Sequence, residues 1–246
     1  MHRPVNFEAA PPVDGDLRRA TRALGAVLWP SRCLLCGDPG ADGRDLCAAC
    51  AATLPWNLAA CGRCALPLPV PTPACGTCLR RPPLVQATRA VFVYGFPLDR
   101  LLPRLKFHDG LAAGRLLAQL AAEGLANAER PEALVPIPLH RDRLRNRGYD
   151  QSLELARPLA RQLDLPLRHD LLRRVRATAP QSRLDAKARR RNLRDAFEVC
   201  SKRPLPAHVA LFDDVMTTGA TLHAAARALR QAGVARVDAW VCARVP

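Results

Sequence analysis

Runs of apolar residues predict alternating strands and helices along most of the chain. Arg89 to Tyr94 alternates as a half-buried strand does, whereas Leu134 to Pro138 and Val209 to Phe212 are nearly continuous runs that suit buried strands. Leu98 to Phe107 and the Ala/Leu-rich segment from Leu111 to Ala128 are typical of helices instead. This order predicts an α/β fold, in which helices flank a parallel sheet.

A polar turn follows the strand predicted at Val209 to Phe212. Asp213 and Asp214 are expected at its carboxyl end, the edge at which open parallel sheets bind ligands. Residues 217–221 then read Thr-Thr-Gly-Ala-Thr and open a helix whose apolar spacing over residues 222–229 indicates one buried face. Hydroxyls and free N–H groups at a helix N-terminus suit a phosphate, and the carboxylates suit vicinal hydroxyls or Mg²⁺. The alternative is an ordinary helix capped by threonine.

Four Cys-x-x-Cys pairs use eight of the ten cysteines, with ten residues between each pair and the next. Two such turns complete a tetrahedral thiolate shell, so the spacing predicts two structural zinc ions. Consecutive pairing is favoured over interleaved pairing, and a disulfide framework would need an oxidising compartment for which no export signal is present. Cys200 and Cys242 are expected to be core thiols. The predicted zinc ligands are Cys33, Cys36, Cys47, Cys50, Cys61, Cys64, Cys75 and Cys78.

The remaining segments define the expected organisation. Residues 1–30 form a leader with one amphipathic helix, residues 31–80 a double zinc ribbon, and residues 85–246 the α/β domain. The apolar part of the leader, from Ala23 to Pro30, is shorter than the roughly 20 residues that a membrane span needs. We therefore expect a cytoplasmic protein with no transmembrane segment.

The charge balance points to an anionic partner. The chain has 37 basic and 22 acidic residues, a formal charge of +15. Arginine runs at residues 141–147 and 189–194 suit a phosphorylated ligand or nucleic acid, although a solvated basic face has the same composition. Arg147 to Gln151 fits a pyrophosphate contact, or equally a helix capped by Asp150.

The string from Val209 to Thr221 resembles the ribose-5-phosphate loop of the type I phosphoribosyltransferases. By that resemblance Asp213 and Asp214 are the catalytic-site residues that bind the 2′ and 3′ hydroxyls of phosphoribosyl pyrophosphate (PRPP). Mg²⁺ accompanies the pyrophosphate group. The residues implied to bind the 5-phosphate are Thr217, Thr218, Gly219, Ala220 and Thr221, and the further implied ligand contacts are Arg147, Tyr149, Lys106 and Arg189.

Together with the cysteine pairs, these motifs resemble one family, the ComF family of double-zinc-ribbon, phosphoribosyltransferase-like proteins associated with DNA uptake. The resemblance also covers Val135 to Pro138, Thr178 to Leu184 and Phe197. It implies a Mg²⁺-dependent PRPP-binding protein that acts in DNA uptake or single-stranded DNA handling. The partners it implies are PRPP, single-stranded DNA, and DNA-uptake or helicase proteins. Two alternatives stay open: a phosphoribosyltransferase whose acceptor the sequence does not identify, and a non-enzymatic zinc-ribbon adaptor for nucleic acid.

Overall fold

The computed structural model describes residues 30–105, 110–176, 196–200 and 203–246. The chain divides into two compact units, residues 1–51 and residues 52–246, and each is described by itself below. The leader up to residue 29, Lys106 and the basic loop that contains Arg189 lie outside the described residues. The domain boundaries predicted from the sequence stay a prediction.

The described part of the first unit is built from tight turns. The amide of Cys33 donates to the carbonyl of Asp38 at 2.7 Å, and the amide of Gly37 donates back to the carbonyl of Cys33 at 2.9 Å. Helix α2 (Ala48–Ala52) begins directly after Cys47. Such turns bury few apolar side chains, so a bound metal is expected to contribute much of the folding free energy here.

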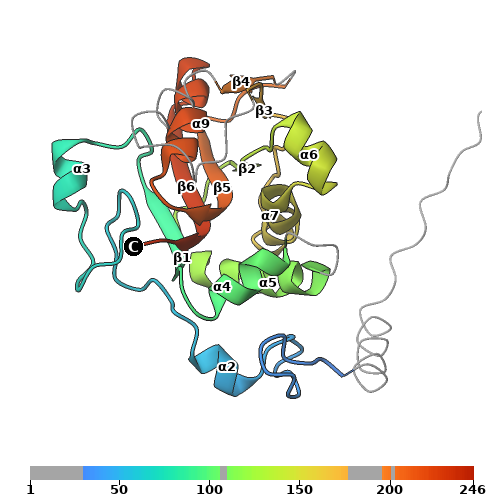
Figure 1. The fold of residues 1–246 in the computed structure, drawn as a ribbon. Helices are drawn as coiled ribbons and strands as arrows, with labels where there is room; N and C mark the ends of the chain where they lie inside the picture. Colours follow the sequence, from blue (N-terminus) through green and yellow to red (C-terminus); the bar gives the residue numbers. More distant parts are fainter. Residues whose placement is uncertain (1–29, 106–109, 177–195, 201–202) are drawn as a thin grey trace, which may run out of the picture. The chain divides into compact units, whose positions relative to one another are not determined.

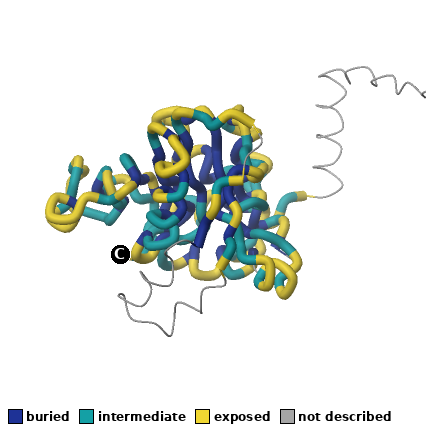
Figure 2. The backbone as a smooth tube through the Cα atoms, turned by 90° about the horizontal axis from the view of Figure 1, so that it is seen from above, coloured by how far each residue is buried: buried dark blue, intermediate teal, exposed yellow. Residues whose placement is uncertain are grey.

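A four-stranded parallel sheet forms the centre of the second unit (Figure 1). Parallel strands that are buried on both faces have continuous hydrophobic sequences, and this is why the apolar segments of the chain form the strands of this sheet. Figure 2 shows these strands buried along most of their length, with exposed loops around them. The strand order is β1 (Thr88–Val93), β6 (Arg236–Arg244), β5 (His208–Met216) and β2 (Ala133–Pro136).

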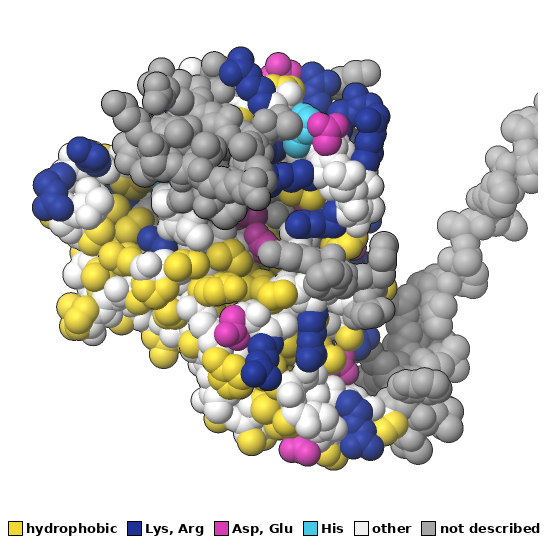
Figure 3. Space-filling model, viewed as in Figure 1, with side chains coloured by type: hydrophobic (Ala, Val, Ile, Leu, Met, Phe, Trp, Pro, Cys, Tyr) yellow, Lys and Arg dark blue, Asp and Glu magenta, His cyan; other side chains and the backbone are white. Residues whose placement is uncertain are grey.

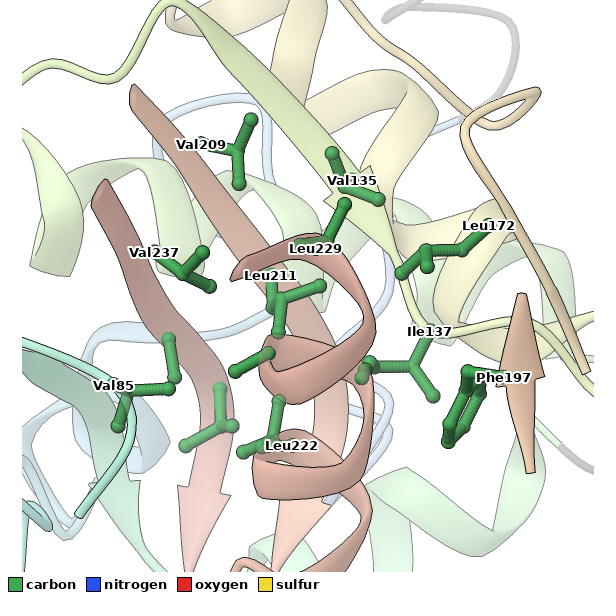
Figure 4. Close-up of a cluster of buried hydrophobic side chains, with 14 of the residues drawn as sticks. Val85, Val135, Ile137, Leu172, Phe197, Val209, Leu211, Leu222, Leu229 and Val237 are labelled. Atoms are coloured by element: carbon green, nitrogen blue, oxygen red, sulfur yellow. The ribbon is translucent and has the colours of Figure 1, made fainter. Parts of the chain in front are cut away.

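Helix α9 (Ala220–Gln231) covers one face of this sheet. Its Leu222 and Leu229 are 2% and 0% exposed and pack with Val209 and Leu211 of β5, as Figure 4 shows. Side chains alternate between the two faces of a strand, so the buried Phe212 points to the other face. Each leucine buried in this way contributes about 1.5–3 kcal/mol. The predicted helical face of residues 222–229 is therefore the one that carries the packing.

The other elements surround this core. Helix α5 packs against α7 and β1, and α7 packs against β2 and β5, while β3 and β4 form a separate antiparallel pair. The bounds of these elements are α3 (Gly76–Arg80), α4 (Leu98–Arg104), α5 (Leu111–Leu125), α6 (Arg141–Arg147), α7 (Gln151–Gln162), β3 (Leu172–Arg174) and β4 (Phe197–Val199). The parallel sheet flanked by helices confirms the predicted α/β fold.

One boundary differs from the prediction in a way that affects the site. Strand β5 does not end at Phe212 but runs on to Met216, so both aspartates lie inside it. The reason is strand pairing: β2 follows β5 only as far as Phe212, whereas β6 pairs with it as far as Met216. Asp213 and Asp214 therefore occupy the part of β5 that has lost one neighbour.

Candidate functional site

The eight predicted zinc ligands form two separate quartets. Within each quartet the sulfur atoms all lie within 4.8 Å of one another, and the grouping is the consecutive one. The members are Cys33, Cys36, Cys47 and Cys50 in the first centre, and Cys61, Cys64, Cys75 and Cys78 in the second. Four thiolates close the tetrahedral shell of a zinc ion, which fits a structural rather than a catalytic metal.

Backbone geometry prepares these thiols for a metal. Burial opposes ionisation of Cys33, but hydrogen bonds from backbone N–H groups, among them that of Cys47, outweigh it and lower its pKa to about 6. In the same way the pKa of Cys61 is lowered to about 7, and the amide of Cys75 lies 3.1 Å from its sulfur. One thiol in each centre is thus favoured as the thiolate that a metal binds.

The two cysteines outside the quartets differ from each other. Cys242 is 1% exposed, as expected of a core thiol, and burial raises its pKa. Cys200 is exposed, so the prediction of a core position was wrong for it. It directly follows β4 at the end of the two-stranded β3–β4 sheet; its amide donates to the carbonyl of Leu171, but its side chain is exposed.

Asp213 and Asp214 stand side by side in β5, and the described residues that donate to Asp213 are neutral. The hydroxyl of Ser152 donates to Asp213 Oδ1 at 2.9 Å, and the amide of Asp214 donates to the same oxygen at 3.0 Å. Burial raises the pKa of Asp213 well above its usual range, and the charge of Asp214 raises it further. The pair is therefore a site of excess negative charge that a cation or hydroxyl donors would stabilise.

The loop after β5 turns at a glycine and leads directly into α9. Gly219 precedes α9 with a φ of 72°, in the left-handed region, and a Cβ atom there would lie 2.6 Å from Met216 Cε. Only glycine suits both conditions. Thr217 and Thr218 are exposed, and the hydroxyl of Thr218 accepts from the amide of Ala220 at 3.4 Å. Hydroxyls and the N-terminus of a 12-residue helix thus meet beside the two aspartates.

Asp150 takes the capping role that the sequence left open. Its Oδ1 accepts from the amide of Leu153 at 3.2 Å, and its Oδ2 accepts from the amide of Leu139 at 2.7 Å. Its pKa is raised by burial first and also by the charge of Asp214, so it belongs electrostatically to the same edge of the sheet. Asp150 fixes the start of α7, which presents Ser152 to Asp213.

The neighbouring predicted contacts are partly engaged within the protein. Arg147, at the end of α6, donates to the side chain of Gln151. Gly148 ends α6 with a φ of 83°, and burial raises the pKa of Tyr149, the next residue. The structure thus brings Arg147 to the first turn of α7. Lys106 and Arg189 are outside the described residues, so their predicted roles stay predictions.

Three residues near this edge were missed from the sequence. Ser152 is 5% exposed and holds Asp213; Arg174 is 6% exposed, and its pKa is lowered by burial although Asp213 and Asp150 raise it. His223 donates its backbone N–H to the carbonyl of Gly219, and burial, with Arg227, lowers the pKa of its imidazole. No motif marks these positions: Ser152 and Arg174 reach the site through tertiary packing, and His223 lies in the first turns of α9 without a distinctive pattern.

In the part of the chain that the structure describes, no helix is both long and apolar enough to cross a membrane. Helix α6 presents basic side chains to solvent: Arg141 and Arg145 are exposed, and none of the residues of the helix is buried. Basic side chains are prominent near this helix in the space-filling view (Figure 3).

Comparison with known proteins finds relatives both of the cysteine-rich segment and of nearly the whole chain. A double zinc ribbon domain family matches residues 24–79. The DNA utilization protein YhgH of Salmonella typhimurium is 36% identical over 223 residues, which cover 87% of this chain and 97% of that protein. Competence protein F of Haemophilus influenzae is 40% identical over 156 residues, covering 60% of this chain and 68% of that protein.

A more distant relative has the same kind of name. Competence protein ComFC of Bacillus subtilis is 30% identical over 154 residues, 62% of this chain and 61% of that protein. Similarity along nearly the whole chain, the matched double zinc ribbon and the two cysteine quartets lead to one conclusion: this chain belongs to the ComF family.

Proposed function

We propose that the protein binds PRPP together with Mg²⁺ at the edge of the sheet where β5 ends, and that it acts in DNA uptake or single-stranded DNA handling. One observation carries the ligand: the acidic pair Asp213–Asp214 lies three residues from a glycine-hinged, threonine-rich turn at the N-terminus of α9. A sugar phosphate needs hydroxyl acceptors and a phosphate cradle at this spacing.

The electrostatics support the same ligand. Asp213 has a raised pKa because it is buried beside Asp214, so the free protein holds a charge that it poorly stabilises. Ribose hydroxyls would donate to the two carboxylates, and carboxylate oxygens are the donor set that Mg²⁺ prefers. A magnesium ion would supply positive charge to the pyrophosphate group. Thr217, Thr218 and the amides up to Thr221 would bind the 5-phosphate.

The role in DNA uptake rests on the relatives. They are named competence proteins and DNA utilization proteins, and one of them aligns over 87% of this chain. The net charge of +15 suits a polyanionic partner.

Calorimetric titration of PRPP with Mg²⁺ into the zinc-loaded protein tests the ligand. We expect binding that disappears in the Asp213→Ala, Asp214→Ala double variant. Asp142→Ala is the matched control, because that carboxylate lies on α6 with a side chain that is 65% exposed and pairs with His140. Absence of binding by the intact protein would overturn the proposal. Binding would justify a screen for acceptors that release pyrophosphate.

A second candidate, a zinc-ribbon nucleic-acid adaptor, is favoured by the arginines of α6. Four of its seven residues are arginine, and the helix buries none of its side chains in the core. This function predicts single-stranded DNA binding that weakens steeply with salt and survives the double aspartate variant. Replacing Arg141 and Arg145 with glutamine would then reduce the salt dependence, whereas PRPP affinity would not change.

A further inference from the structure

Arg244, the last residue of β6, lies between the second cysteine quartet and the end of β5. Its Nε donates to the backbone carbonyl of Cys64 at 3.1 Å, and its Nη1 lies 3.4 Å from the carbonyl of Met216. Cys64 is a member of the second quartet, and Met216 immediately precedes the threonine-rich turn. One guanidinium therefore contacts both parts.

The environment of Arg244 explains why an arginine is kept there. The side chain is half buried, and burial lowers its pKa, whereas the thiols of Cys64, Cys75 and Cys78 raise it. Four thiolates around one Zn²⁺ carry a net charge of about −2 (−4 + 2). The planar guanidinium, which is weakly hydrated and has five donors, suits a position that must neutralise this charge and still donate to the carbonyls of Cys64, Met216 and Val245.

Met216 connects Arg244 to the threonine-rich turn at residues 217–221. It is 4% exposed, and its carbonyl also accepts from the amide of Val245 at 2.9 Å, so the end of β5 is tied to the end of β6. Its methyl carbon lies 2.6 Å from the position that a Cβ atom of Gly219 would take, so the Met216 side chain packs directly against the backbone of Gly219. A displacement of Met216 would therefore move the backbone of the turn, since interiors are close-packed.

We propose that Arg244 is a positioning residue that couples metal occupancy of the second cysteine quartet to the conformation of the turn at residues 217–221. When the quartet holds its metal, the carbonyl of Cys64 is fixed and Arg244 holds Met216 under Gly219. When the metal is lost, the ribbon loses its folding free energy, Arg244 loses an acceptor, and the turn loosens. The effect on ligand affinity rests on the proposed function; the effect on the turn does not.

Hydrogen exchange of the full-length protein tests the coupling without any ligand. We expect amides in peptides covering residues 215–223 to exchange about ten-fold faster in the Cys75→Ser, Cys78→Ser variant, which lacks the second centre, and likewise in Arg244→Met. Arg244→Lys, which keeps the charge but replaces the guanidinium fork with a single ammonium group, should lie between. An unchanged rate in either the cysteine variant or Arg244→Met would overturn the proposal.

Two matched controls separate coupling from general instability. Arg236→Met removes another arginine of the same strand, at its other end, where it pairs with Glu129 and Asp238. Cys33→Ser, Cys36→Ser removes the first centre, which belongs to the other unit. Neither should accelerate exchange at residues 215–223 selectively. Equal acceleration in Arg236→Met would show that Arg244 has no special role.

A second experiment tests the coupling with ligand: if metal in the second centre favours ligand binding, ligand binding must in turn favour retention of that metal. PRPP with Mg²⁺ should slow zinc release to a chromophoric chelator from the second centre about ten-fold, measured in Cys33→Ser, Cys36→Ser so that only that centre contributes. Arg244→Met should abolish this protection. If the protein binds no PRPP, the proposed function fails while the exchange experiment still decides the coupling; if PRPP binds without slowing release, the coupling fails alone.

Discussion

Strands β5 and β6 each carry an aspartate with a different set of hydrogen-bond donors: Asp238 is buried near the start of β6, and Asp213 is half-buried farther along β5. At the start of the strands Asp238 accepts from Arg236 at 3.0 Å, from the amide of Ala87 at 3.1 Å, and lies 2.9 Å from the ring of His208. At the far end Asp213 receives neutral donors from the described part of the chain and stands beside Asp214. Asp238 thus contacts cationic side chains directly. Asp213 interacts with the charge of the buried Arg174, yet its pKa stays raised because burial and the charge of Asp214 oppose its ionisation.

On the proposed function, this difference separates a structural carboxylate, Asp238, from a ligand-binding one, Asp213. A buried charge with a cationic partner contributes to a defined fold, although it is costly to break. A buried charge with a raised pKa and a like charge beside it costs stability in the free protein, and such sites are where ligands bind. The two aspartates are only three register positions apart in the sheet, because Asp238 pairs with Ala210 and Asp213 pairs with Val241.

The largest effect on stability is expected at Asp238. Asp238→Ala removes the carboxylate that contacts His208 and one of the two carboxylates that pair with Arg236, at a residue that is 3% exposed. We expect it to lower the free energy of unfolding by about 4 kcal/mol, the cost of breaking a buried pair. Urea unfolding measures this loss. PRPP affinity of the folded fraction should be unchanged, and a matching loss of affinity would contradict the comparison.

At the other end the same kind of change should act in the opposite direction on stability. Asp213→Asn removes a charge whose pKa is raised by burial and by Asp214. We expect PRPP affinity to fall about 100-fold, the effect of removing a charged hydrogen-bond acceptor, while the free energy of unfolding rises by about 1 kcal/mol. Calorimetry and urea unfolding of one preparation measure both quantities.

The pH profile provides the control for Asp213→Asn. The pKa of Asp213 is higher in the folded than in the unfolded protein, so the folded state binds more protons between the two values. The destabilising contribution of Asp213 therefore grows as the pH rises from about 3.9 through the raised pKa, and it vanishes at lower pH. The stability gain of the variant should disappear at low pH, and PRPP affinity of the wild type should fall there. A pH-independent gain would contradict this origin.

A comparison of two glycines distinguishes the effect of backbone strain on stability from an effect on the turn beside Asp213. Gly219 and Gly233 both have positive φ values, 72° and 103°, but of the two only Gly219 has an atom, Met216 Cε, where a Cβ would be placed. Gly219→Ala and Gly233→Ala should each lower the free energy of unfolding by about 1–2 kcal/mol. Only Gly219→Ala should also weaken PRPP binding. Equal losses of affinity would show that the turn is not special.

Features of the fold and the site that depend on residues close together in the sequence could be predicted, whereas features that depend on contacts between distant segments could not. The metal quartets were predictable because Cys-x-x-Cys spacing is local, and consecutive pairing is the simplest way to close two shells. The α/β fold followed from apolar runs. The extension of β5 past Phe212 did not, because it depends on β6 pairing as far as Met216, beyond the end of β2.

Contacts between distant segments were missed for the same reason. Ser152 reaches Asp213 across 61 residues, and Arg244 reaches Cys64 across 180. Neither position carries a distinctive residue pattern, and a serine after a capped helix start is ordinary. The capping role of Asp150 was one of two interpretations that local rules left open, and the hydrogen bonds to Leu139 and Leu153 identify it.

The smallest expected effect sharpens the comparison at the level of one hydrogen bond. Ser152→Ala removes the hydroxyl that donates to Asp213 Oδ1 at 2.9 Å and that lowers the pKa of this carboxyl. We expect PRPP affinity to fall about five-fold, since a hydrogen bond to a charged group contributes about 1 kcal/mol or more. The pH at which affinity is lost should also move upward, because the carboxylate has lost a donor. Ser152→Thr, which keeps the hydroxyl, should retain the wild-type profile. A drop in affinity without a shift of the profile would make Ser152 a packing residue, and would leave Asp213 fixed by the strand alone.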